Sequence, residues 1–494
     1  MLPTGRIRQA PASLLERTVL NSRFDWEVQH LLRHYQWIEM VQTEEYVRMG
    51  VLDPDMGERI RGAVAGLSAE EVAAEHGTTM SDTLFAMERA LYARIPAQAT
   101  AWHVDRSRND VQACAQLMFG RERLLGVAET VRGLADAAVL AASGHTGSIM
   151  PGHTQHQWAQ AITLGFYLAA LAEAATTAAE SLHALYDGIN LSPLGAGALA
   201  GLELPWDRSR MAAALGFHAP QPHALTSVAS RGWVLRCAAE LSVLGTTVSR
   251  FLTDLLWWSG SSCRFIDLPD ELAGISSAMP HKRNFPILER IRGMSGHLVG
   301  LSFDLMIGQR NTGYTNLVEV SKESTRFLED LFDTSETMLA LLQRVIADLR
   351  FHPDRAGKAV NGEPLAAAAV ANHLTLENHV PARTAQVIVG SWIAAGAQDD
   401  PAPDALSLSS LAVACEEQGY RLRLGEDRLR ELLDAEEGVR RRRTSGSARP
   451  QDVHELLEQT RERLDAVDRT AAGQAEALRT AWQDSTATST EVSA

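Results

Sequence analysis

A long stretch without proline, between Pro222 and Pro269, constrains the fold of this chain more than any other feature. Within it, from Ser227 to Trp258, apolar residues recur in steps of three and four and so form one stripe along a helix. These residues are Val234, Ala238, Leu241, Leu244, Val248, Leu252 and Leu255. A helix of this length spans roughly 48 Å. Helices so long are stable when they pack side by side, so the stripe predicts a helical bundle.

Four other segments have the same helical pattern: residues 121–143, 159–186, 287–306 and 321–349. Alternating runs of β-branched residues are hard to find, and aromatic residues make up only 6% of the chain. We therefore predict an all-α fold built around a central antiparallel bundle of long helices.

Shorter helical runs and proline-marked breaks on either side of the bundle predict the domain organisation. We expect an N-terminal helical domain at 1–103, the central bundle at 104–350 and a C-terminal helical domain at 351–468. Residues 469–494 would form a tail, disordered after about Gln483, because its Ser/Thr-rich end cannot bury apolar surface.

The formal charge excludes several classes of partner. The chain of 494 residues has 46 Lys and Arg against 61 Asp and Glu, a net charge of -15. This field argues against binding nucleic acid or an anionic membrane, and any anionic ligand must be held by local donors. The four cysteines lie far apart, and no signal peptide or transmembrane run is evident, so a cytoplasmic protein is expected. Neither metal-ligand spacing nor a Gly-rich phosphate loop occurs, so we expect no metal and no cofactor.

Polar residues crowd into three stretches between the predicted helices: HVDRSRNDVQ (103–112), PGHTQHQWAQ (151–160) and ISSAMPHKRN (275–284). Taken singly, the first two fit helix capping: Ser107 would cap a helix with Arg108 and Asn109 in its first turn, and Thr154 would cap another. For the third, a helix break at Pro280 and a functional loop fit equally well.

Taken together, the three stretches resemble the motifs of the argininosuccinate lyase and fumarase superfamily, in the same order. The third resembles the loop GSSxMPxKxN, matched by Ser276, Ser277, Met279, Pro280, Lys282 and Asn284. The first resembles the HxxRSRND motif of argininosuccinate lyases, and PLGAGALAG (193–201), VPARTAQVIVG (380–390) and RRRTSGS (441–447) resemble further pieces of that branch. The resemblance covers residues 20 to 468 and implies a fumarase/aspartase-like fold.

The resemblance also implies roles for individual residues. Ser276 would be the base that removes a proton, Lys282 would stabilise the developing charge, and Glu289 would complete the catalytic set. The remaining positions would bind a dicarboxylate substrate: Ser107, Arg108, Asn109, Thr154, Gln155, Asn284, Tyr314 and Lys322. It further implies a homotetramer with sites shared between chains.

The chain departs from the family pattern at several positions. Gln155 stands where the second motif has a histidine, and Leu84 replaces another histidine, in SDTLFAMER. In SVASRGW, Arg231 is kept while two acids are lost to Ser230 and Gly232. The residues expected to hold the dicarboxylate persist, whereas those expected to hold the leaving group are altered.

The resulting functional hypothesis is a carbon–nitrogen lyase, similar to argininosuccinate lyase, that eliminates fumarate from an N-substituted aspartate in arginine biosynthesis or a related reaction. Two alternatives stay open. One is a diverged lyase with a different leaving group, or one that acts in the addition direction in secondary metabolism. The other is a non-catalytic scaffold protein.

Overall fold

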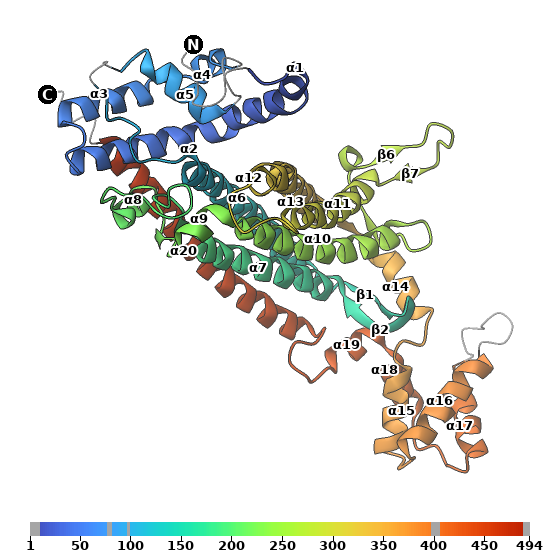
Figure 1. Cartoon of the computed structure of the whole chain (residues 1–494). Helices are drawn as coiled ribbons and strands as arrows, with labels where there is room; N and C mark the ends of the chain where they lie inside the picture. The colour runs from blue at the N-terminus through green and yellow to red at the C-terminus, as the bar shows by residue number, and fades with distance from the viewer. Residues whose placement is uncertain (1–9, 77–81, 96–98, 397–405, 488–494) are drawn as a thin grey trace.

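The computed structural model describes residues 10–76, 82–95, 99–396 and 406–487. Over these residues the protein is mostly helical, and its long helices run side by side along one elongated body (Figure 1). The bundle is made by five helices: α6 (Arg108–Gly144), α7 (Leu164–Ile189), α10 (Gly232–Ser259), α11 (Pro286–Gln309) and α13 (Leu328–Ala347). The predicted all-α bundle is confirmed.

The predicted apolar stripe of α10 is the reason why this helix sits in the bundle. All seven residues of the stripe are buried, none more than 6% exposed. The helix begins later than predicted, because Ser230 has an extended backbone that separates a short helix, α9 (Ala224–Ala229), from α10.

Two other predicted helices are also shorter than expected. Residues 159–163, predicted as helix, belong to strand β2 (Gln157–Thr163), and Thr163 then caps α7 by accepting a hydrogen bond from the Phe166 amide. Residues 321–327 precede α13 and contain the last residue of a short helix and a 3₁₀ turn (Glu323–Thr325). Helical periodicity continued across both boundaries, so it could not locate them.

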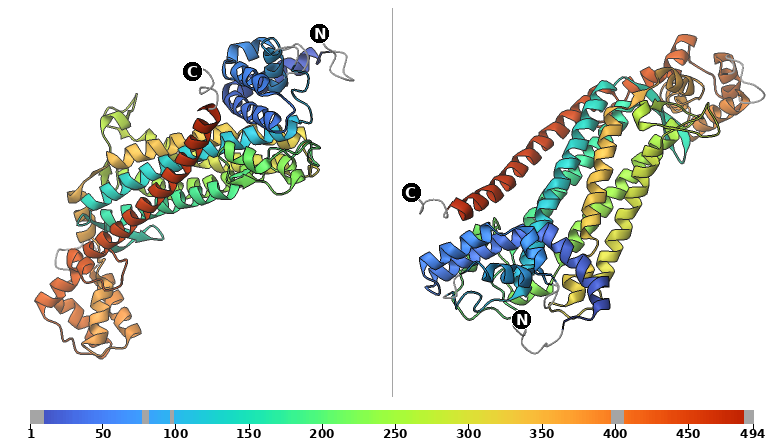
Figure 2. Two further views of the ribbon diagram at one scale, coloured as in Figure 1. Left: turned by 90° about the vertical axis from the view of Figure 1, so that its left-hand side faces the viewer. Right: turned by 90° about the horizontal axis from the view of Figure 1, so that it is seen from above.

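An N-terminal group of helices packs across one end of the bundle (Figure 2). It contains α1 (Ser13–Leu15), a π-helical turn (Glu16–Leu20), α2 (Asn21–Arg48), α3 (Pro54–Ala65), α4 (Ala69–Ala74) and α5 (Thr83–Tyr92). Its buried residues belong to the same continuous core as those of the bundle.

The C-terminal helices divide between two cores. A separate small core joins α15 (Ala367–Leu376), α16 (Ala382–Gly396), α17 (Leu408–Glu417) and α18 (Glu426–Leu433). In contrast, α20 (Pro450–Ala487) returns along the bundle and packs on α6 and α7. Two short helices, α14 (Pro353–Asn361) and α19 (Ala435–Arg440), connect the two parts.

The end of α20 corrects one prediction. Residues 484–487, expected to be disordered, belong to this helix, and residues 488–494 lie outside the described part of the chain. The helix also runs without a break through residue 468, where we placed the end of the C-terminal domain. The boundaries at 103 and 350 stay a prediction.

Within the described ranges, the strands form four two-stranded ladders at the ends of the bundle. The pairs are β1 (Ile149–Thr154) with β2, β3 (Leu191–Ser192) with β4 (Ala219–Pro220), β5 (Ile266–Asp267) with β8 (Arg350–Phe351), and β6 (Gly274–Ile275) with β7 (Arg283–Asn284). The remaining short helices are α8 (Arg208–Ala214), a 3₁₀ turn (Asp270–Leu272) and α12 (Val318–Ser321). No helix of the described residues is both long and apolar enough to cross a membrane.

Candidate active site

The first polar stretch begins α6, as its capping pattern predicts. Ser107 is the N-cap residue, and its Oγ accepts a hydrogen bond from the Asn109 amide at 3.2 Å. Arg108 Nη1 donates to Asp82 Oδ2 at 2.8 Å, and its guanidinium lies over the Phe85 ring. The start of α6 is thereby fixed against α5.

The loop of residues 193–201 is held against the same helix start. Asp110 is buried, and its Oδ2 accepts hydrogen bonds from the amides of Gly195 and Gly197 at 2.9 and 3.0 Å. Asn109 Nδ2 donates to the Ala198 carbonyl at 3.1 Å. Gly197 has a φ of 63°, and a Cβ there would lie 2.7 Å from the Gly201 carbonyl oxygen, so only glycine fits.

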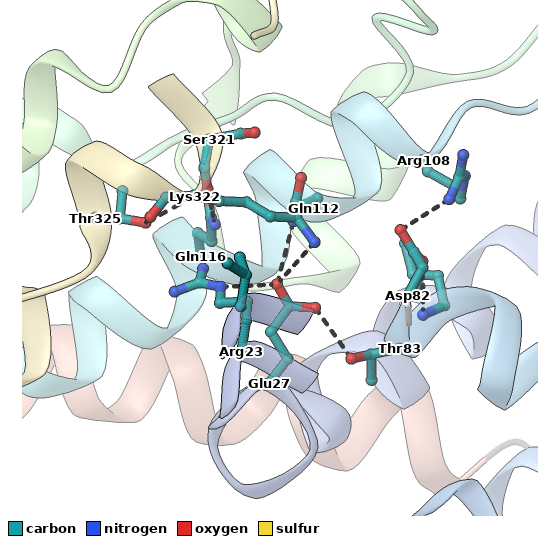
Figure 3. A network of polar contacts seen from close by, with 12 residues as sticks. Arg23, Glu27, Asp82, Thr83, Arg108, Gln112, Gln116, Ser321, Lys322 and Thr325 are labelled. Atoms are coloured by element: carbon teal, nitrogen blue, oxygen red, sulfur yellow. Dashed lines mark hydrogen bonds and ion pairs between the residues drawn. The ribbon is translucent and has the colours of Figure 1, made fainter. Parts of the chain in front are cut away.

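Lys322 approaches this end of the bundle from α12, where Glu27 holds it (Figure 3). The Lys322 Nζ lies 3.4 Å from Glu27 Oε1, and Glu27 is only 2% exposed. The Glu27 carboxylate also accepts hydrogen bonds from Arg23, Thr83 and Gln112. A buried carboxylate with these donors fixes the position of the ammonium group. We did not predict Glu27 from the sequence, because one acid in an amphipathic helix carries no visible signal.

Tyr314 lies at the same end of the bundle, in the loop after α11. Its side chain is 63% exposed, and its hydroxyl lies 3.4 Å from Thr226 Oγ1. Arg231, kept from the family pattern, is by contrast buried, and its Nε donates a hydrogen bond to Gln116 Oε1. In this chain it therefore has a structural role. Burial lowers the Arg231 pKa to about 10.

A cavity of about 340 Å³ opens beside Ser107 and Arg108. Its other walls are lined by Glu39, Leu84, Phe85, Met87, Glu88, Leu91, His103, Arg106 and Val111. Burial raises the pKa of Glu88 above its ordinary value. Leu84, which replaces a histidine of the family pattern, gives this cavity an apolar surface next to the predicted substrate-binding residues Ser107 and Arg108.

The second polar stretch lies at the opposite end of the bundle and does not cap a helix. Thr154 ends β1, and Gln155 and His156 form the turn of the β1–β2 hairpin, with φ of 49° and 58°. Two consecutive residues with positive φ are typical of a two-residue hairpin turn, so the predicted cap at Thr154 is wrong. Thr154 and Gln155 are both exposed.

Aromatic contacts hold this hairpin on the end of α10. Trp158 stacks on Trp257 with ring centroids 4.9 Å apart, and His153 meets the same ring edge-on. His153 Nε2 lies 3.4 Å from Asp254 Oδ1, whose other oxygen accepts a hydrogen bond from the Tyr167 hydroxyl. These contacts, which the sequence did not predict, fix the base of the turn that carries Gln155.

The third polar stretch forms a second hairpin, β6–β7, that projects from the bundle (Figure 1). Ser276 lies at its tip, where its Oγ accepts a hydrogen bond from the Met279 amide at 3.1 Å. Lys282 is exposed, Asn284 Nδ2 lies 3.5 Å from the Ile275 carbonyl, and Glu289 is exposed in the first turn of α11. Pro280 thus interrupts no helix but sits in a hairpin tip.

The predicted site residues therefore form two groups in one chain. Ser107, Arg108, Asn109, Tyr314 and Lys322 lie at one end of the bundle. At the other end lie Thr154, Gln155, Ser276, Lys282, Asn284 and Glu289. Between the groups runs α6, whose 37 residues span roughly 55 Å. One chain alone does not bring the groups together. Among the described residues, no cluster of His, Cys, Asp or Glu could hold a metal ion.

The architecture of this protein is thus an elongated bundle of long helices with polar loops at both ends. A family model described as "Lyase" matches residues 65–300. The argininosuccinate lyase of Desulfotalea psychrophila is 30% identical over 400 residues, covering 79% of this chain and 84% of the relative. Argininosuccinate lyase 1 of Mesorhizobium japonicum is 29% identical and covers 93% of this chain and 97% of its own length.

Solved structures agree with these sequence matches. A variant of EDDS lyase with bound fumarate superposes with a TM-score of 0.86 at 25% identity, covering 99% of this chain and 98% of that chain. A class II fumarase from Schistosoma mansoni superposes with a TM-score of 0.66 at 14% identity, covering 88% of this chain and 96% of that chain, a likeness of fold alone. The chain belongs to the fumarase/aspartase superfamily of lyases.

A buried ion pair beside the 340 Å³ cavity gives a prediction about stability. Glu39 is 2% exposed and makes two hydrogen bonds with Arg106, at 2.7 and 2.8 Å, plus one with Trp102. Substituting Glu39→Gln leaves the Arg106 charge buried and unpaired, so we expect a loss of about 3–5 kcal/mol in the free energy of unfolding. Urea denaturation measures it. The exposed pair of Glu436 with Arg440 supplies the control, since Glu436→Gln should cost less than about 1 kcal/mol.

The same pair gives this loss a pH dependence. Although burial alone would raise the Glu39 pKa, the Arg106 guanidinium outweighs it and holds that pKa well below its ordinary value. The ionised Glu39 carboxylate therefore makes its full contribution to the free energy of unfolding above the unfolded-state pKa of about 4.3. This contribution is lost as pH falls below that value. The difference between parent and Glu39→Gln should shrink in acid. A difference no larger than that of the control at pH 7 would contradict this account.

Proposed function

We propose that this protein is a carbon–nitrogen lyase that releases fumarate and an amine from an N-substituted aspartate, either argininosuccinate or a related compound. The observation that carries the proposal is the β6–β7 hairpin, where Ser276 Oγ already accepts an amide hydrogen bond and Lys282 follows on the same loop. Membership of the lyase superfamily, and relatives that are argininosuccinate lyases, support the reaction class.

The proposed reaction begins with removal of a proton from the carbon next to a substrate carboxylate. A serine hydroxyl is a weak base, so the Ser276 alkoxide needs stabilisation by loop amides, of which Met279 is one, and by the Lys282 ammonium. The proton goes to Ser276, and the electron pair passes into the neighbouring carboxylate. The carbon–nitrogen bond then breaks and its electrons leave with nitrogen, which takes up a proton from an acid or from water to become the amine. The new carbon–carbon double bond makes fumarate.

Charge stabilisation is the main requirement of this sequence, because the first step adds a second negative charge to a carboxylate. Lys282 and Asn284 on the hairpin would provide for this charge. Ser107 and Asn109 lie at the N-terminus of α6, where the helix dipole and free amides favour carboxylate groups. Lys322, held by Glu27, would add a fixed positive charge at the same end.

We further propose that the protein works as a homotetramer with sites shared between chains. The exposed part of α11 supports association, because Val299, Phe303 and Met306 recur at helical spacing and are 46%, 66% and 41% exposed. Gly296 and Gly300 lie on the same stripe, with open space around them. An exposed apolar stripe on a long helix is typical of an interface. Packing between chains would also let the Ser276 end of one chain meet the Ser107 end of another.

Fumarate release tests the proposed reaction directly. With argininosuccinate and a panel of N-substituted aspartates, we expect fumarate from at least one substrate, measured by its ultraviolet absorbance. Because Ser276 is the proposed base, Ser276→Ala should lower kcat by at least about 100-fold. Ser261→Ala, an exposed serine outside the motif, is the matched control and should keep parent activity.

If no substrate in the panel yields fumarate and Ser276→Ala behaves like the parent, the lyase proposal fails. Calorimetric binding of fumarate without any product would then support a ligand-binding scaffold instead.

A second candidate is a lyase with an altered amine partner, for which Gln155 and Leu84 are the specific observations. An amide cannot donate a proton as an acid, so the leaving group would be a stable anion, or the enzyme would add an amine to fumarate. Leu84 lines the cavity beside Ser107, where an apolar wall suits a partner unlike the guanidinium of arginine.

Substituting Gln155→His separates the two candidates. Histidine tolerates positive φ, so the hairpin turn should form as before, and thermal unfolding should be unchanged. If glutamine is required by an altered partner, activity on the true substrate falls in the variant. A gain of argininosuccinate turnover without that loss would contradict the second candidate and favour simple divergence.

A further inference from the structure

A cavity of about 550 Å³ lies where the C-terminal helices meet the β1–β2 hairpin. Figure 1 shows α18, α19 and β2 converging at this place. Its walls come from β2, α15 and its preceding turn, α18, α19 and the RRR segment at 441–443. None of the predicted catalytic or substrate-binding residues lines it.

About half of the lining of this cavity is apolar. This part is formed by small aliphatic side chains: Ala161, Leu365, Ala366, Ala368, Ala369, Leu376, Leu432 and Ala435. Such a lining provides space and contact area for the hydrocarbon part of a ligand, as in most small-molecule sites.

The lining is also basic, in a chain whose net charge is -15. Arg428, Arg441, Arg442 and Arg443 all line the cavity, against the single acid Glu377. Arg428 pairs with Glu431, which lies outside the lining, and Arg441 donates to the Glu431 and Leu432 carbonyls at the end of α18. In the described part of the chain, the guanidinium groups of Arg442 and Arg443 make no hydrogen bond or ion pair, so they are free to bind an anion.

His373 adds a second, independent observation. It lines the cavity from α15, and its Nε2 is shielded from solvent without a hydrogen-bond partner among the described residues. A buried polar nitrogen without a partner costs free energy, so it favours a ligand that supplies one.

We propose that this cavity is a binding site for a small organic anion, with a phosphate or carboxylate group on an apolar body. The anionic group binds Arg442 and Arg443, because guanidinium forks match both oxyanions in a two-point geometry. The apolar body contacts the alanine and leucine side chains of the lining, and His373 Nε2 makes a hydrogen bond with a polar atom of the ligand. This inference does not depend on the lyase reaction.

The position of the cavity gives its occupant a structural effect. Gln160 and Ala161 line it from β2, and β2 pairs with β1 up to the turn that carries Gln155. A ligand that bridges β2 and α15 should therefore stabilise this hairpin against local opening.

Isothermal titration of the full chain with phenyl phosphate, benzoate, inorganic phosphate and phenol tests the site. We expect saturable binding of phenyl phosphate or benzoate, and the stronger of the two identifies the preferred anion. Inorganic phosphate and phenol, each with half of the required chemistry, should bind at least about tenfold more weakly.

Variants locate the binding. The double variant Arg442→Gln with Arg443→Gln should lower the affinity for the probe by about tenfold or more. The reason is that a hydrogen bond to a charged group is typically worth about 1.5–3 kcal/mol. Arg344→Gln with Arg479→Gln removes the same charge from exposed pairs elsewhere and should leave the affinity unchanged. Hydrogen exchange of residues 149–163 should slow with the probe in the parent and not in the first variant.

The proposal is overturned if neither organic anion binds saturably, if inorganic phosphate binds as tightly as the organic anions, or if the two double variants bind alike. Unchanged exchange in residues 149–163 despite binding would refute the bridging geometry and place the ligand elsewhere.

Discussion

The packing of long helices side by side fixes the positions of the predicted site residues in this chain. α6 is fixed along its length against α7 and α13, and its 37 residues separate the Ser107 end from the hairpin end by roughly 55 Å. The polar loops at the two ends therefore cannot share one pocket within a chain, and the proposed chemistry depends on another chain that supplies the missing half.

Buried charges hold the Ser107 end in shape. Glu27 gathers Lys322 and three donors from α2, α5 and α6, while Glu39 holds Arg106 just before the helix start. Each carboxylate is almost fully buried, so these ion pairs and hydrogen bonds replace the solvent that the charge would otherwise need. The hairpin end is built differently: aromatic contacts fix β1–β2, whereas β6–β7 projects and leaves Ser276 accessible.

Much of this architecture could be predicted from the sequence. The spacing of apolar residues gave α10 its buried stripe, and the cap at Ser107 formed as its residues indicated. The cap predicted at Thr154 does not form, because the chain there makes a two-residue turn with positive φ at Gln155 and His156, and no glycine or asparagine marks that turn in the sequence. Contacts between distant segments, such as Glu27 with Lys322, also leave no local pattern.

Mixing two inactive variants tests the shared site most directly. Asn109→Ala damages the helix-start end, and Ser276→Ala damages the hairpin end, so each alone should lack fumarate release. When the two are co-expressed and purified together, some sites combine an intact Asn109 from one chain with an intact Ser276 from another, and activity should return. If the mixed oligomer stays as inactive as its parents, each site is built within one chain, and the account is wrong.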